Sequence, residues 1–386
     1  MRILRSRTRS EPDPGRHGLP NRFRAAPSPP RPRADSAAAR YTGMVGPRLL
    51  VIAILLVSCG GPSIAPTSPS LMAASASPTA SPTLEPTPSP TARPIASVLE
   101  GIDPAKLNDH MVALASFGSR DVRNPNHAKA VAYLKEQLGA IPGITVRSHL
   151  GTYQSLPLEN ILAFIDPLAP APEQGWIMIC AHYDSISSFQ PGWTPAKAAT
   201  MAAPGADDNG TGTAALLEYA RVLAQERSTL RQRIVLAFFD GEELFFKGSA
   251  SYLGTLGTPA PYAAVINIDM VGFNPIADRL DLIYYTNGSA ALRDQVIAAN
   301  DRYRIGVAPL VSQLASSGAT ILDAAPFGLA GIPAVALVQR YGENDATFPG
   351  NYTFHTVDDT PDKVTNKRLW LKAAKLTLAT ALELAR

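Results

Sequence analysis

Apolar runs typical of β-strands alternate with helical patterns along the chain after residue 95. This alternation favours a largely parallel sheet with helices on both faces. The predicted strands are Thr145–Tyr153, Asn160–Ile165, Trp176–Ala181, Arg233–Phe239, Ala263–Ile268, Leu280–Tyr285 and Ala334–Val338. The predicted helices are Asp103–Phe117, Pro125–Leu138, Thr211–Gln225, Ala290–Tyr303 and Pro361–Leu384. We therefore expect one domain over residues 96–386, a three-layer α/β/α sandwich with a mostly parallel central sheet.

The first 95 residues have a different composition and no pattern of a packed core. Residues 1–43 are rich in Arg, Pro, Ser and Ala. This composition predicts disorder, unless translation starts at Met44 and the segment lies upstream of the true start. Residues 44–59 contain a short basic stretch, a short apolar run and then Cys59 followed by Gly. They are similar to a lipoprotein signal peptide whose lipobox cysteine is lipidated, with an ordinary cleavage site as the alternative.

Residues 60–95 repeat Pro, Ser, Thr and Ala, a composition that predicts an extended linker. Acyl chains on Cys59 would anchor the protein to a bacterial membrane on its extracytoplasmic side, and without them it would be secreted. From Met44 onward the chain has 25 basic and 29 acidic residues, a net charge of −4. Because no basic stripe is present, we expect no nucleic-acid binding. Cys180 lies in an apolar run and is expected to be a buried thiol.

Side chains that bind metals follow several of the predicted strands. These residues are His182, Glu242, Glu243 and Asp269. In open α/β sheets ligands bind beyond the carboxyl ends of the strands, so these side chains are expected to converge. Together with Asp208 and His355 they make a set of nitrogen and oxygen ligands that suits Zn²⁺. The pattern predicts two metal ions that activate a water beside a carboxylate that takes its proton, which is the chemistry of hydrolysis.

Each of these residues also has an ordinary structural explanation. A single histidine at a strand end is usually structural, although Asp184 is placed to hydrogen-bond the free ring nitrogen of His182. Asp208 lies where a helix N-cap is expected, and Asp207 or Asn209 would serve that purpose equally well. The Glu pair fits a solvated turn, Asp269 fits an ion pair, and His355 fits an ordinary loop. Their joint presence in this order favours the metal site.

The motifs resemble those of the co-catalytic zinc exopeptidases, the metallopeptidase family of bacterial leucyl aminopeptidases, with glutamate carboxypeptidase II and glutaminyl cyclase as relatives. The resemblance extends from about Gly118 to the C-terminus. Its motifs are Gly205-Ala206-Asp207-Asp208-Asn209-Gly210-Thr211-Gly212, Gly241-Glu242-Glu243 with Gly248-Ser249, Asn267 to Gly272, Pro326-Phe327 with Gly331-Ile332-Pro333-Ala334, and Phe354-His355-Thr356 through Asp359-Thr360.

The resemblance implies a role for each site residue. Asp208 bridges two Zn²⁺ ions, with His182 and Asp269 completing one ligand set. Glu243 and His355 complete the other. Glu242 is the general base and later the acid that protonates the leaving amine, while Asp184 orients His182. The resemblance also implies a cis peptide bond between Asp208 and Asn209 and a peptide substrate. The sequence gives no indication of oligomeric state.

The chain departs from this family before the Pro-Phe motif. Many relatives have Ser-Asp-His where this chain has Leu322-Asp323-Ala324, and some have a tyrosine that stabilises the oxyanion where this chain has Ala319. The candidate replacements are Tyr183, Tyr341 and Tyr352. We expect the long loop over residues 185–205 to form a wall of the cleft.

The sequence is compatible with three alternatives to an aminopeptidase. A glutaminyl cyclase-like acyltransferase is compatible with the sequence from Phe238 to Glu243. A carboxypeptidase would need a cation for the terminal carboxylate, for which the candidates are Lys247, Arg304 and Arg340. A binding module on the same fold would be expected to have lost ligands, and this chain retains all five.

Overall fold

The computed structural model describes residues 92–314, 322–339 and 350–386. The described residues belong to one unit of the chain, which begins at Leu84. The expectations for residues 1–43, for the signal peptide with Cys59 and for most of the linker lie outside the described residues, as do Ala319, Arg340 and Tyr341. None of the helices in the described part of the chain is both long and apolar enough to cross a bilayer.

The described residues form an eight-stranded sheet in the order β1-β2-β4-β3-β5-β8-β6-β7. The strands are β1 (Thr145–Tyr153), β2 (Leu156–Ile165), β3 (Trp176–His182), β4 (Ile234–Phe239), β5 (Tyr262–Asp269), β6 (Arg279–Tyr284), β7 (Ala308–Gln313) and β8 (Ala334–Val338). The central strands β4, β3, β5 and β8 run parallel to one another. The antiparallel pairs join β1 to β2, β2 to β4 and β6 to β8. The expected parallel centre is confirmed, and the outer pairings make the whole sheet mixed.

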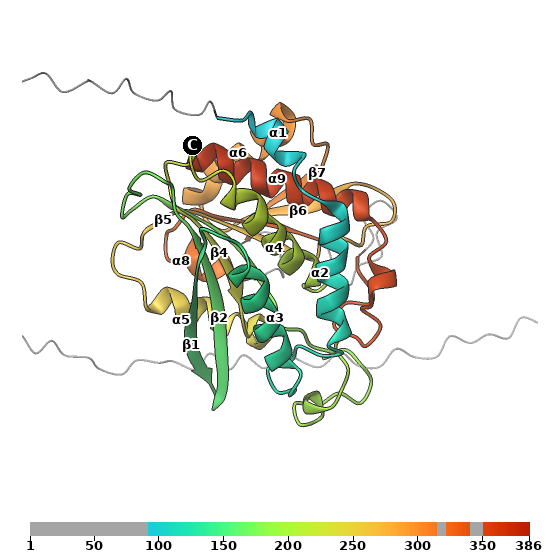
Figure 1. Ribbon diagram of the computed structural model, residues 1–386. Coiled ribbons are helices and arrows are strands. Elements are labelled where there is room, and N and C mark those ends of the chain that lie inside the picture. The colour runs from blue at the N-terminus through green and yellow to red at the C-terminus, as the bar shows by residue number, and fades with distance from the viewer. Residues whose placement is uncertain (1–91, 315–321, 340–349) are drawn as a thin grey trace, which may run out of the picture. The chain divides into compact units, whose positions relative to one another are not determined.

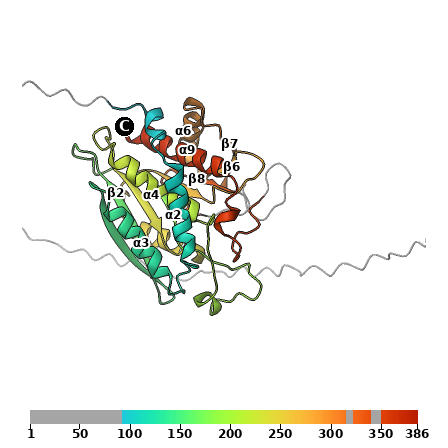
Figure 2. The same cartoon turned by 45° about the vertical axis from the view of Figure 1, so that its right-hand side comes forward.

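Helices cover both faces of this sheet, as Figures 1 and 2 show. They are α1 (Ile95–Leu99), α2 (Pro104–Ser116), α3 (His127–Gly139), α4 (Gly210–Ala224), α5 (Lys247–Gly254), α6 (Ala290–Arg302), α8 (Ala325–Leu329) and α9 (Lys367–Ala385), with 3-10 turns at Lys197–Ala199, Glu242–Leu244, Asn287–Ser289 and Pro361–Lys363. One apolar cluster joins α1, α2, α3, α4, α6 and α9 to the sheet, and a second cluster joins α5 and α8 to the opposite face. The predicted three-layer sandwich is therefore confirmed.

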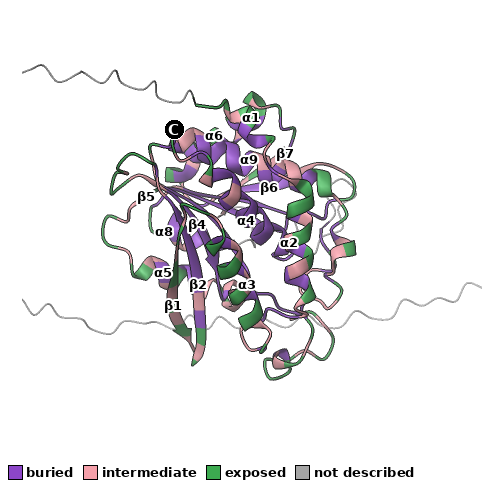
Figure 3. Ribbon diagram, viewed as in Figure 1, coloured by how far each residue is buried: buried purple, intermediate pink, exposed green. Residues whose placement is uncertain are grey.

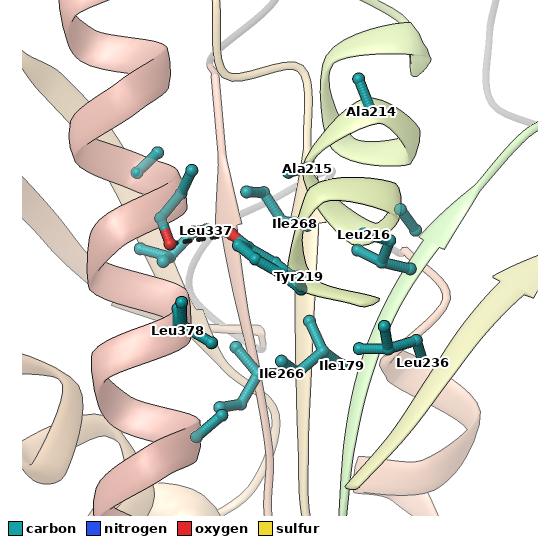
Figure 4. Close-up of a cluster of buried hydrophobic side chains, with 14 of the residues drawn as sticks. Ile179, Ala214, Ala215, Leu216, Tyr219, Leu236, Ile266, Ile268, Leu337 and Leu378 are labelled. Carbon is teal, nitrogen blue, oxygen red and sulfur yellow. Dashed lines mark hydrogen bonds between the residues drawn. The ribbon is translucent and has the colours of Figure 1, made fainter. Parts of the chain in front are cut away.

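The central strands are apolar on both faces because each face packs against a layer of helices. Ile179 and Leu236 belong to the cluster under α4 and α9, while their neighbours Cys180 and Ala237 belong to the opposite cluster. Figure 4 shows Tyr219 of α4 directed across this core toward α9, where its hydroxyl donates to the carbonyl of Ala374 at 2.9 Å. Figure 3 shows that burial is continuous along these strands. Cys180 is buried and free, as expected.

Most predicted elements form with small differences at their ends, and two helix starts were wrong. The helix predicted from Pro125 begins at His127, and the side chain of Asn124 before it accepts from the backbone of Asn126. Pro361 begins only a 3-10 turn, and α9 starts at Lys367 after Asn366, whose side chain accepts from the backbone of Leu369. The helices α1, α5 and α8 and the strand β7 are short and were not predicted from the sequence.

Candidate active site

Four of the predicted site residues lie at the carboxyl ends of three neighbouring strands. His182 is the last residue of β3, and Asp269 is the last residue of β5. Glu242 and Glu243 lie in the 3-10 turn that follows β4. Because β4, β3 and β5 are adjacent in the sheet, the backbone carries all four side chains to the same edge.

Asp208 lies between the two histidines, with one carboxylate oxygen facing each of them. Its Oδ1 is 3.3 Å from Nε2 of His182, and its Oδ2 is 3.2 Å from Nε2 of His355. Asp269 completes the first side, with Oδ2 at 3.4 Å from Nε2 of His182. Glu243 completes the second side, with Oε2 at 2.8 Å from Nε2 of His355. The structure thus brings all five predicted ligands together.

The donor atoms fall into compact groups that fit metal ions. Among the described residues, three groups have ligand atoms within 4.8 Å of one another: His182, Asp208 and Asp269; Asp208, Glu243 and His355; and His182, Glu242 and Glu243. The first two share Asp208, so its carboxylate is placed to face two cations. Imidazole nitrogens with carboxylate oxygens are the ligands that Zn²⁺ takes in open, catalytic sites.

Two observations on the acidic side chains support this fit. Oε1 of Glu243 and Oδ1 of Asp269 are buried and have no hydrogen-bond partner among the described residues. Burial, opposed by the charge of His355, raises the pKa of Glu243 to about 7. Burial also raises the pKa of Glu242 well above its usual range, and Glu243, Asp323 and Asp269 add to the shift. Buried carboxylates in such proximity are costly without compensating positive charge, which two cations would supply.

Asp184 connects His182 to the turn that carries the two glutamates. Its Oδ1 accepts from the backbone N–H of Glu242 and its Oδ2 from that of Glu243, each at 3.2 Å. The same carboxylate lies 3.4 Å from Nδ1 of His182, and the backbone carbonyl of Asp184 lies at 3.2 Å from that nitrogen. Asp184 is therefore placed to orient His182, as the resemblance implied, and it also holds the glutamate turn.

Replacing Asp184 by Asn is expected to weaken zinc binding by about 10- to 100-fold, as loss of a residue that orients a metal ligand usually does. The amide replaces one acceptor oxygen by an NH2 group, which would set a donor against the backbone N–H of Glu242 or Glu243. Competition with a chromogenic chelator measures the effect. Asp166→Asn is the matched control, because Asp166 pairs with Arg233 outside the site. Equal zinc affinities in the two variants would contradict the assignment.

The residues on either side of Asp208 have roles different from that of Asp208. The Asp208–Asn209 peptide bond is cis, as the resemblance implied. The N-cap of α4 is Asn209, whose Oδ1 accepts from the backbone of Gly212 at 2.8 Å. Asp207 is buried but turned elsewhere, accepting from the backbone of Gly272 and from Nδ2 of Asn351. Asn209 thus caps the helix and Asp208 faces the two histidines, while Asp207 does neither.

Two charged residues to which the sequence assigned no role support this loop. Both oxygens of Asp359 accept backbone N–H groups, from Asp207 at 3.0 Å and from Asp208 at 2.9 Å. Arg120 is completely buried and donates to the carbonyls of Tyr183 at 2.6 Å and Gly205 at 2.8 Å. Burial lowers the pKa of Arg120 to about 10, so the guanidinium remains charged at neutral pH beside the acidic cluster.

The long loop after β3 contacts the second histidine. Oγ of Ser188 lies 3.1 Å from Nδ1 of His355, and the backbone N–H of Phe189 donates to the carbonyl of His355 at 2.9 Å. The Phe189 ring lies 5.1 Å from the His355 ring and is 63% exposed. This part of the loop therefore borders the site, in agreement with the expected wall.

The contacts of the candidates for accessory roles involve other parts of the domain. Tyr183 is buried, and its hydroxyl donates to the carbonyl of Glu159, so it is unsuited to stabilise an oxyanion. Tyr352 is exposed and packs against Phe273. Arg304 lines a cavity of about 260 Å³ formed with α1 and α9, and Lys247 lies 5.0 Å from the centre of the Tyr153 ring of β1.

An α/β/α sandwich that gathers two histidines and several carboxylates at the carboxyl ends of its central strands has the architecture of a metal-dependent hydrolase. The chain belongs to peptidase family M28, whose family model matches residues 160–381. The protein is thus a peptide hydrolase by family, and the predicted resemblance is confirmed.

Relatives with assigned names are consistent with this family. The chain is 26% identical over 310 residues to leucine aminopeptidase 1 of Pyrenophora teres f. teres, covering 75% of this chain and 73% of the relative. Among solved structures, the LapA aminopeptidase of Legionella pneumophila superimposes with a TM-score of 0.62 at 22% identity, covering 75% and 74% of the two chains. A Porphyromonas gingivalis glutaminyl cyclase gives 0.59 at 22% identity, covering 73% and 98%. At this identity the two structures support the fold alone.

Proposed function

We propose that the protein is a zinc-dependent aminopeptidase that hydrolyses the first peptide bond of substrates with a free N-terminus. The observation that carries the proposal is the position of Asp208, with one oxygen toward His182 and the other toward His355. The family match and the relatives named leucine aminopeptidase support the reaction class.

Two zinc ions would be held by residues that the structure already groups. The first would take His182, Asp208 and Asp269, and the second Asp208, Glu243 and His355. Zinc in such a site supplies Lewis acidity and lowers the pKa of water toward neutrality. Asp184 would orient the ring of His182, and Ser188 would orient the ring of His355 through its contact with Nδ1.

Glu242 would be the group that moves protons. It would accept a proton from the attacking water and later deliver it to the leaving amine, a role that needs a carboxyl beside the reacting atoms. Two contacts support this role: its backbone is fixed by Asp184, and its side chain lies in a group with His182 and Glu243.

A peptide panel tests the reaction and separates it from the alternatives. We expect cleavage of leucyl and other aminoacyl peptides and no cleavage after N-acetylation of the same peptides. Cyclisation of a peptide with N-terminal Gln would instead support the acyltransferase. Release of C-terminal residues from N-acetylated peptides would support a carboxypeptidase.

We also propose that the domain is attached to the outer face of a bacterial membrane by a lipid on Cys59. The support is the sequence of residues 44–59 and the linker that follows. Replacing Cys59 by Ala is expected to move the protein from the membrane fraction to the soluble fraction after expression in a bacterium. Equal membrane association of the variant and the natural sequence would refute the anchor.

A further inference from the structure

Asp240 precedes the turn that carries Glu242, and its side chain joins the start of this turn to β2 and α3. This residue follows β4, and its side chain is completely buried. One carboxylate oxygen accepts the backbone N–H of Glu159 at 2.8 Å, and the other lies 2.9 Å from Nε2 of His127. Because an ionised carboxylate only accepts hydrogen bonds, Nε2 of His127 is the donor.

His127 contacts Asp240, before the glutamate turn, and Tyr183, in the segment after β3. It is not a member of the metal-binding groups. It is the first residue of α3, and its ring packs against Tyr183 with the ring centres 5.4 Å apart. Tyr183 lies between His182 and Asp184 in the chain. Although burial opposes the charged form of His127, the hydrogen bond and charge of Asp240 raise its pKa. The geometry places the imidazole N–H against a buried carboxylate, and a hydrogen bond to an ionised acceptor is stronger than a neutral one.

The turn after Asp240 has a backbone that needs such an anchor. Gly241 has φ 65°, and Phe245 and Phe246 have φ 65° and 49°. Left-handed conformations at residues with side chains persist only where the surroundings enforce them. Asp240 holds the start of the turn and Asp184 holds its middle. Loss of the first anchor would leave the turn to Asp184 and to the hydrogen bond from the backbone N–H of Asp240 to Oδ1 of Asn160, at 2.9 Å.

We infer that His127 is a positioning residue for Glu242, acting through Asp240. The inference rests on the proposed function, since it assigns to Glu242 the proton transfer described above. A simpler explanation is that His127 only docks α3 on the domain. His110 offers the comparison, because its Nδ1 lies 2.7 Å from the hydroxyl of Tyr133 and joins α2 to α3 away from the turn.

Three variants test the inference: His127→Ala, His127→Gln and the control His110→Ala. We expect His127→Ala to lower kcat by about 10- to 100-fold with KM and bound zinc nearly unchanged, because a small displacement of a catalytic group has an effect of that size. Glutamine retains an amide N–H that donates to Asp240, so His127→Gln should recover most of the loss. His110→Ala should change the melting temperature without a specific effect on kcat.

Hydrogen exchange gives a second readout that does not need activity. Amides of residues 241–246 should exchange faster in His127→Ala than in the natural sequence, and His110→Ala should leave them unchanged. Equal exchange and equal kcat in the two alanine variants would overturn the inference. If the natural sequence cleaved no peptide but exchange in this turn still responded to His127 alone, the proposed function would fail while the positioning of the turn would stand.

Discussion

Replacing Glu242 by Gln is expected to lower kcat by about 10²- to 10⁴-fold while zinc remains bound, because general acid–base groups contribute rate factors of that size. The amide has nearly the size of the carboxyl group but cannot accept a proton from water. Measuring kcat and bound zinc on the same sample checks both parts of the prediction.

Glu136→Gln is the matched control, because it makes the same chemical change on α3, outside the site. Two outcomes would contradict the role of Glu242. Retained turnover would show that another group takes the proton. Loss of one zinc ion would show that Glu242 is a ligand, a possibility that its group with His182 and Glu243 makes concrete.

Replacing Asp208 by Asn is expected to reduce bound zinc by at least one ion per chain and to abolish turnover. The asparagine amide has one neutral oxygen where the carboxylate has two charged ones. It therefore cannot direct one oxygen to a metal ion beside His182 and another to a metal ion beside His355. The backbone contacts of Asp208 with Asp359 do not depend on the side chain, so the loop itself should stay in place. Metal analysis after gel filtration, with activity measured on the same fractions, gives the result.

Asp207→Asn provides a sharp comparison because the two residues are adjacent and both are buried. Asp207 accepts a hydrogen bond from Nδ2 of Asn351. An asparagine at this position would either direct its own NH2 group at that donor or leave a buried polar group without a partner. This variant should therefore melt at a lower temperature yet retain its zinc. Loss of zinc from Asp207→Asn with retention in Asp208→Asn would reverse our assignment of the bridging residue.

The sequence predicted the fold well wherever local patterns carry the information. The apolar period identified β1 (Thr145–Tyr153) and β8 (Ala334–Val338) with the bounds that the structure has. Helix starts were harder, because prolines at Pro125 and Pro361 suit a helix start but also suit turns. In both places an asparagine further along, Asn126 or Asn366, precedes the helix that forms.

For the site, the sequence showed which residue types follow the strands but not what holds them. His182 and Asp269 could be proposed because strand ends of a parallel sheet converge. Arg120 and His127 gave no such signal, and Asp359 belonged to a motif without indicating a role, since each acts through a contact between segments far apart in the chain. A lone charged residue in a loop has no periodicity that would mark it for such a contact.

The most direct test of the account is zinc content measured together with peptide cleavage on one preparation of the protein. We predict about two zinc ions per chain, as expected for a bridged pair. We also predict cleavage that requires a free N-terminus and is lost on removal of the metal. A preparation that binds no stoichiometric metal and cleaves no peptide would contradict the account and favour a binding role for this fold.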